Sequence, residues 1–152
     1  MAYQTTYTQF QPDGFAGMIG NMEEWNGLTR TATATIGFGA PAQRNGDKSC
    51  SPLASGGEFI GVAIAHHVLT SANGDSYAQY DNVPLADEAG KIGGIAGAAI
   101  AVGAALNWDT VALRWTTASA SGTVIAVPGA EADTAASGAG VFFWVRLRRT
   151  PS

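Results

Sequence analysis

A run of seventeen residues without an ionisable side chain, 92–108, most limits how this chain can fold. It lies between Lys91 and Asp109 and is shorter than the roughly 20 predominantly apolar residues of a membrane-spanning helix. Its four glycines, at positions 93, 94, 97 and 103, would each weaken a soluble helix by about 1 kcal/mol relative to alanine. A GxxxG spacing occurs among them, but it promotes helix pairing only inside a membrane span. The run therefore favours β-structure.

Apolar side chains in and after this run recur at every second position, which is the period of a half-buried strand. A turn is expected at 107–109, and the alternation continues on both sides of it. The alternating residues are Ile100, Val102 and Leu106 before the turn, and Val111, Leu113 and Trp115 after it.

Five further segments have the alternation or composition of strands: 29–38, 59–70, 76–83, 123–127 and 140–149. Asn73-Gly74, a strong hairpin signal, separates the second from the third, and Pro128-Gly129 ends the fourth. The linkers are rich in Gly, Pro, Asn, Asp and Ser, and no convincing amphipathic helix or internal repeat interrupts the pattern. These features predict an all-β fold, a small antiparallel β-sandwich or barrel of the jelly-roll kind.

The surface is expected to be poor in charge. Charged residues make up 13% of the chain, against about 25% in a typical soluble domain, so a lone domain would be poorly protected against association. A partner or copies of the chain itself are expected to cover much of it. The net charge of −4 argues against a nucleic-acid partner and against docking on an anionic membrane. A single cysteine and an N-terminus without a signal peptide fit assembly in a reducing cytoplasm.

No group of residues has the spacing of a catalytic or metal site. The G-x-G-x-x-A at 37–42 lacks the helix that a dinucleotide site requires after it. His66 and His67 are neighbours in an expected strand, so they point to opposite faces and cannot easily share a metal. Cys50 lies in an expected loop, and nothing places a base beside it. We therefore expect no enzymatic activity, no cofactor and no metal.

The C-terminal segment 140–149 has two distinct faces. One is predicted to enter the core and consists of Val141, Phe143, Val145 and Leu147. The other is predicted to meet a partner, because aromatic residues and arginine are enriched at interfaces. That face consists of Phe142, Trp144, Arg146 and Arg148. The alternative is that a neighbouring loop of the same subunit covers Trp144.

The N-terminal residues 1–25 are aromatic but follow neither the strand period nor the helix period. They are too aromatic for a typical disordered tail. We predict an extended arm at 1–25, followed by a single β domain at 26–152. The anchors of the arm on a partner surface would be Tyr3, Tyr7, Phe10, Phe15, Met18 and Trp25. The alternative is that this segment is the first strand of the domain itself.

Several stretches, in order along most of the chain, resemble the structural cement proteins of tailed bacteriophages, which decorate the head. These stretches are "GFAGMIGN", "LTRTATATIGFGAPAQ", "FIGVAIAHHVL", "DSYAQYDNV", "GKIGGIAGAAIAVGAAL" and "VPGAEADTAASGAGVFFWVRL". Each consists mainly of small and aliphatic residues, and their order carries the resemblance. The "GAALNWD" segment departs from the tighter glycine-acid turn of the family, and the closing strand is richer in aromatic residues.

The resemblance implies a decoration protein that binds the outside of the major capsid lattice and stabilises the mature head. The implied partners are the major capsid protein and further copies of the chain, as a homotrimer or alternatively a dimer. The implied location is the outer capsid surface, after assembly in the bacterial host cytoplasm. Two other interpretations remain at this point: another virion β-module, such as a tail or fibre component, and a small cytoplasmic ligand-binding domain.

Overall fold

The computed structural model describes residues 14–20, 25–66 and 74–148, and the described residues form strands and turns without a helix. Eleven strands follow one another within these described ranges. They are β1 (Trp25–Ala32), β2 (Ile36–Gly37), β3 (Pro41–Asn45), β4 (Ser49–Pro52), β5 (Phe59–Ala63), β6 (Ser76–Tyr77), β7 (Asn82–Ile95), β8 (Ala105–Asp109), β9 (Arg114–Thr116), β10 (Val124–Ala132) and β11 (Phe142–Leu147).

The first half of the molecule is a closed barrel. Its strands are hydrogen-bonded in the order β1-β4-β3-β5-β7, and β1 pairs with β7 to complete the circle. The predicted β-barrel is therefore confirmed. The pairing differs from a purely antiparallel one at β1 and β4, which run parallel with Thr31 beside Ser49. Closure removes the unpaired strand edges that promote uncontrolled aggregation.

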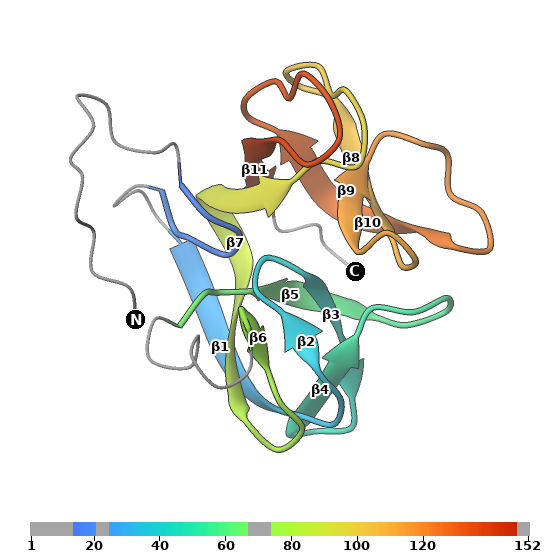
Figure 1. Ribbon diagram of the computed structural model, residues 1–152. Helices are drawn as coiled ribbons and strands as arrows, with labels where there is room; N and C mark the ends of the chain where they lie inside the picture. Colours follow the sequence, from blue (N-terminus) through green and yellow to red (C-terminus); the bar gives the residue numbers. More distant parts are fainter. Residues whose placement is uncertain (1–13, 21–24, 67–73, 149–152) are drawn as a thin grey trace.

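The second half is a curled sheet that also returns to β7. From the C-terminal part of β7 the order continues through β11, β10, β8 and β9. Ala96, just past β7, forms a parallel bridge with Trp115 of β9, and the N–H of Gly97 donates to Trp115 O at 2.7 Å. We call this half the second sheet. Figure 1 shows it lying at one end of the barrel, with β7 passing from one unit into the other.

Strand β7 is buried on both faces where the two units meet, and this explains the glycine-rich run. A Cβ on Gly94 would lie 2.8 Å from the Trp115 ring and 2.9 Å from Val145. A Cβ on Gly93 would lie 2.2 Å from the carbonyl oxygen of Phe15. Only glycine lets the Trp115 and Val145 side chains and the Phe15 carbonyl oxygen come this close to the backbone of β7. The glycine-rich run is therefore a closely packed strand.

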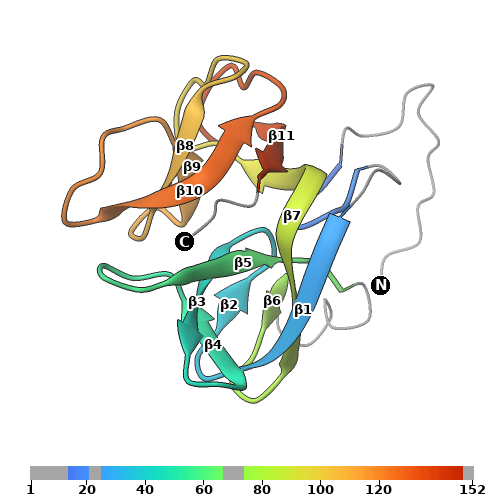
Figure 2. The same cartoon turned by 180° about the vertical axis from the view of Figure 1, so that it is seen from behind.

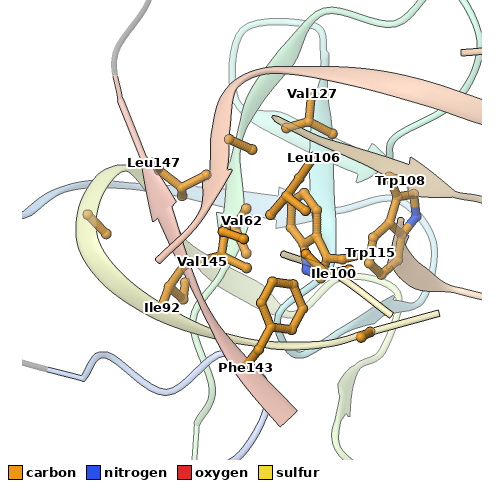
Figure 3. Close-up of a cluster of buried hydrophobic side chains, with 14 of the residues drawn as sticks. Val62, Ile92, Ile100, Leu106, Trp108, Trp115, Val127, Phe143, Val145 and Leu147 are labelled. Atoms are coloured by element: carbon orange, nitrogen blue, oxygen red, sulfur yellow. The ribbon is translucent and has the colours of Figure 1, made fainter. Parts of the chain in front are cut away.

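Two groups of buried side chains form the core. The barrel holds a smaller cluster that includes Ile36, Phe38, Tyr77 and Leu85. The larger cluster belongs mainly to the second sheet, and Val62 of the barrel strand β5 joins it (Figure 3). The hydrophobic contact between the two units is therefore continuous rather than a hinge.

Trp115 joins the second sheet to the barrel most directly. Its indole packs edge-to-face on Trp108 at a centroid distance of 5.3 Å, and its Nε1–H donates to the carbonyl oxygen of Gly39 at 3.2 Å. Gly39 follows β2, which pairs with β6 in a separate two-stranded sheet, and its N–H donates to Ala63 O of the barrel strand β5. Gly39 has a φ of 73°, a conformation that favours glycine. The "GFG" bend of the sequence thus has a packing role.

Several predicted strands are wrong in detail. The segment 29–38 is not one strand, because the chain bends after Ala32 and leaves Ala34 exposed. The segment 59–70 is a strand only at Phe59–Ala63, and 67–70 lies outside the described residues. Strand β10 continues through Pro128-Gly129, where a register shift absorbs the irregular backbone.

The alternation predicted around the uncharged run also fails at its turns. Val102, Val111 and Leu113 were expected to be buried, but all three lie in turns and are exposed. The turn between β8 and β9 covers 110–113 instead of 107–109. In β11 the predicted core residues Phe143, Val145 and Leu147 are buried, whereas Val141 precedes the strand and is exposed.

Candidate interaction surface

The outward face of β11 carries the aromatic pair that the sequence singled out. Phe142 and Trp144 pack edge-to-face at a centroid distance of 5.0 Å and an interplanar angle of 83°. Both are half-buried, because the N-terminal segment of the same chain lies on them. A Cβ on Gly14 would lie 2.6 Å from the Phe142 ring, and a Cβ on Gly20 would lie 2.5 Å from the Trp144 ring. The same-subunit cover weighed for Trp144 is thus present, and any partner contact there would be with the part left exposed.

Residues 14–20 lie along β7 and extend its sheet. The N–H of Gly17 donates to Gly93 O at 2.9 Å, and the N–H of Gly93 donates to Met18 O at 2.8 Å. The N–H of Gly20 donates to Lys91 O at 3.0 Å. This part of the predicted arm therefore packs on its own domain.

The other predicted arm residues divide into two groups. Tyr3, Tyr7 and Phe10 lie outside the described residues. Phe15 and Trp25 are exposed, although Phe15 adjoins the docked glycines and Trp25 begins β1. These two side chains are more exposed than that of Met18, which is half-buried.

The two arginines of β11 take part in ion pairs within the subunit. Arg146 lies 2.7 Å from Asp133 and 3.5 Å from Glu131, and Arg148 lies 3.0 Å from Glu131. Lys91 lies 3.7 Å from Asp133 and completes the network. The cationic side chains are 39–64% exposed, so each pair contributes little to stability. The network remains open on its outer side and can still face a partner.

Outside this network the second sheet is almost free of charge. Residues 92–130 contain two charged side chains, Asp109 and Arg114, and residues 134–145 contain none. The exposed large apolar residues of this region are Val102, Val111, Leu113 and Val141. An uncharged surface with projecting apolar side chains is typical of a protein that is covered in its functional state.

Asp109 fixes the turn that displays two of these residues. Its Oδ1 accepts the N–H of Val111 at 2.8 Å and the N–H of Ala112 at 3.0 Å. These N–H groups, Ala112 first, hold the pKa of Asp109 below its ordinary value. The turn begins at Thr110 and not within 107–109 as predicted; Asp109 is a common turn residue, but the alternation of Val111 and Leu113 obscured the extent of the turn.

The residues considered for chemistry do not come together in the described part of the chain. His66 is exposed past the end of β5, and His67 lies outside the described residues. Cys50 is fully buried, and burial raises the pKa of its thiol, with a smaller opposing effect of Arg30. In the same described ranges, no group of three or more His, Cys, Asp or Glu residues is placed to hold a metal ion. Nor does any helix there have the length and apolarity to cross a membrane.

The fold and surface define a structural β-module, in which a rigid closed framework presents a weakly charged face. The sequence model of the family described as "Structural cement protein (E217 gp24/Pam3 gp6)" matches residues 3–148, nearly the whole chain. The chain belongs to this family of phage structural cement proteins. The match agrees with the resemblance found in the sequence and with the expectation of a non-enzymatic protein.

A solved structure has a similar fold. A chain of "The capsid of Myoviridae Phage XM1" matches with a TM-score of 0.76 and 15% identity, over 98% of this chain and 99% of that chain. At this identity the likeness concerns the fold alone. Among curated proteins, none matches the sequence.

Proposed function

We propose that this phage capsid cement protein binds the outer surface of the major capsid lattice and stabilises the mature head. The observation that carries the proposal is the family match over residues 3–148. The uncharged second sheet supports it, because a surface with so few charges gains from being covered. A ligand that binds only the assembled lattice stabilises that lattice by mass action.

The direct test is the heat resistance of phage heads. Mature heads that lack the protein are titrated with the purified chain, and the temperature at which they release DNA is recorded. The proposal predicts a saturable rise in this temperature. An unchanged release temperature at saturating protein would contradict it and favour another virion position, such as the tail or fibre.

We also propose that the protein acts as a homo-oligomer, a trimer or alternatively a dimer. The low share of charged residues, 13%, supports self-association. Light scattering of the purified protein, together with the footprint of each copy on the head, tests the proposal. A monomer in solution and a monomeric footprint on heads would refute it.

Residues 1–13 are proposed to supply an arm that contacts the capsid or a neighbouring copy, with Tyr3, Tyr7 and Phe10 as anchors. The exposed Phe15 and Trp25 and the open side of the β11 face, which holds Phe142, Trp144, Arg146 and Arg148, would add to this contact. Support comes from Phe15, which follows this segment closely in the sequence and is 41% exposed.

Two truncations distinguish a contribution of the arm to head binding from a contribution of the N-terminal segment to stability. Deleting residues 2–13 keeps the hydrogen bonds that Gly17, Met18 and Gly20 form with β7, so we expect an unchanged melting temperature and reduced binding to heads. Deleting residues 2–20 also removes those bonds and uncovers Phe142 and Trp144, so we expect a lower melting temperature as well. If the shorter truncation binds heads as well as the intact protein does, the arm proposal is wrong.

A further inference from the structure

Two turns hold a large apolar residue in a backbone conformation that disfavours it. Among the described residues, three besides glycine have a positive φ: Asp75 at 54°, Tyr80 at 74° and Leu113 at 54°. Aspartate tolerates this left-handed region, whereas bulky residues rarely adopt it. Tyr80 and Leu113 are also 76% and 65% exposed. Backbone strain and exposure of an apolar side chain therefore coincide at the same two positions.

Tyr80 lies in the tight turn between β6 and β7. The N–H of Asp81 donates to Ala78 O at 3.2 Å, so Tyr80 occupies the third position of a four-residue turn. A positive φ at this position is typical of a type II turn, which favours glycine or asparagine there. Asp81 Oδ2 accepts the N–H of Ala78 at 2.8 Å, and the N–H of Tyr80 donates to Ala32 O at 2.7 Å. The turn is thus fixed to the barrel by hydrogen bonds.

Leu113 closes the four-residue turn between β8 and β9. Asp109 holds the start of this turn through the backbone N–H of Val111. Thr110 anchors it further, because both its N–H and its Oγ1 donate to the carbonyl oxygen of Thr123, at 2.9 and 2.8 Å. Val111 and Leu113 project from this fixed turn into solvent.

A turn that is already ordered loses little conformational freedom when its tip is buried by a partner. Such a tip therefore gains most of the free energy of apolar burial, and tyrosine is among the residues enriched at interface hot spots. Strain at a ligand-binding element is also a common cost of holding a side chain in its bound position. We propose that Tyr80 and Leu113 are two anchors that each insert into an apolar depression on a major capsid subunit. This inference rests on the proposed function.

The placement of the two anchors favours a lattice as their partner. The connection between β6 and β7, to which Tyr80 belongs, lies at the end of the barrel away from the second sheet (Figures 1 and 2). Leu113 belongs to the second sheet. A lattice repeats the same depression on neighbouring subunits, so one chain with two similar anchors spans two of them. The second contact then forms at a high effective concentration, which raises the overall affinity.

The test compares binding with stability in the full-length protein. Tyr80→Gly and Leu113→Gly each remove an anchor and relieve the positive φ, so we expect an equal or higher melting temperature together with at least tenfold weaker binding to expanded heads. Tyr80→Phe and Leu113→Met keep an apolar tip and should bind within about threefold of the original chain. Gln79→Ala is the matched control, since it changes an exposed side chain in the same turn as Tyr80 but keeps the tyrosine, and it should not change the affinity.

Four outcomes decide the matter. Glycine variants that are equally or more stable than the original chain but bind heads more weakly support the anchors. If the original chain binds heads and both glycine variants bind equally well, the anchors are wrong and the proposed function stands. If the original chain fails to bind heads, the proposed function itself fails. If the glycine variants instead change the oligomer size in light scattering while head binding persists, the tips contact another copy and the assignment to the capsid is overturned. Asparagine variants, which tolerate the left-handed region, repeat the test where a glycine variant unfolds.

Discussion

The barrel and the second sheet both bury their strands in a closed arrangement, but their surfaces differ in charge. Residues 25–66 and 74–90, which form most of the barrel, include nine charged side chains: Arg30, Arg44, Asp47, Lys48, Glu58, Asp75, Asp81, Asp87 and Glu88. Residues 92–130 of the second sheet include two. Both units are closed on themselves by hydrogen bonds, so neither needs a partner to complete its strands. The contrast fits the proposal that the barrel serves as a framework and that the second sheet carries most of the binding surface.

The largest expected effect comes from cutting the link between the two units. Trp115 is 1% exposed and hydrogen-bonded to the barrel, so Trp115→Ala leaves a cavity and should lower the free energy of unfolding by about 3–5 kcal/mol. Urea unfolding followed by circular dichroism measures the change, with Trp115→Phe as the milder control. If the barrel stays folded while the second sheet melts, the prediction is wrong, because the two units then unfold independently.

A smaller effect is expected where the N-terminal segment lies on β7. In Gly93→Ala the new Cβ would meet the Phe15 carbonyl oxygen and the Phe142 ring, so residues 14–20 should be displaced. We expect a loss of about 1–3 kcal/mol in stability and faster proteolysis near Phe15. Gly122→Ala is the control, since a Cβ there meets nothing within 4 Å and stability should not change. Equal proteolysis of the two variants would contradict the docked segment.

Alkaline pH should lower the stability of the folded protein through a buried phenol in the core of the barrel. Burial, with a smaller effect of Asp81, raises the pKa of Tyr77 to about 12, and its hydroxyl donates to the carbonyl oxygen of Ile64. The neutral phenol is favoured in the folded state, so its contribution is complete below the unfolded pKa of about 10 and is lost as the pH rises toward 12. Unfolding free energies measured between pH 9 and 12 should fall, and Tyr77→Phe should flatten this fall. A flat profile for the original chain would contradict the burial of this phenol.

The smallest effect concerns the turn of the second sheet. The folded pKa of Asp109 is lowered, so the stabilisation by its carboxylate is present above the unfolded pKa of about 4 and is lost as the pH falls through the folded value. An NMR titration should give an Asp109 pKa below 3.8, and amide exchange at Val111 and Ala112 should quicken in acid. A pKa at or above that value would show that the turn is not fixed by this carboxylate.

The sequence predicted best where a strand has one buried and one open face. In β11 the alternation of Phe143, Val145 and Leu147 is the pattern that the structure buries. The sequence predicted less well where the burial of a strand depends on contacts with residues far along the chain. Strand β7 is buried on both faces, so it shows no alternation, and the pairing of residues 14–20 with it depends on residues far along the chain.

Turn residues were the main source of error for the candidate surface. Val111 and Leu113 continue the period of the strand before them, so alternation placed them in the core. The hydrogen bonds of Asp109 end the strand first and turn both side chains outward. Tyr80 was overlooked for a similar reason, since Asp81 fixes a turn that composition alone does not distinguish from a strand.

The most direct test of the central claim is to image mature phage heads that lack the protein, with and without the purified chain. The account predicts regular new density on the outer capsid surface, of the size of this barrel and second sheet, at positions that repeat with the lattice. Density confined to the tail or fibres, or unchanged heads at saturating protein, would contradict it.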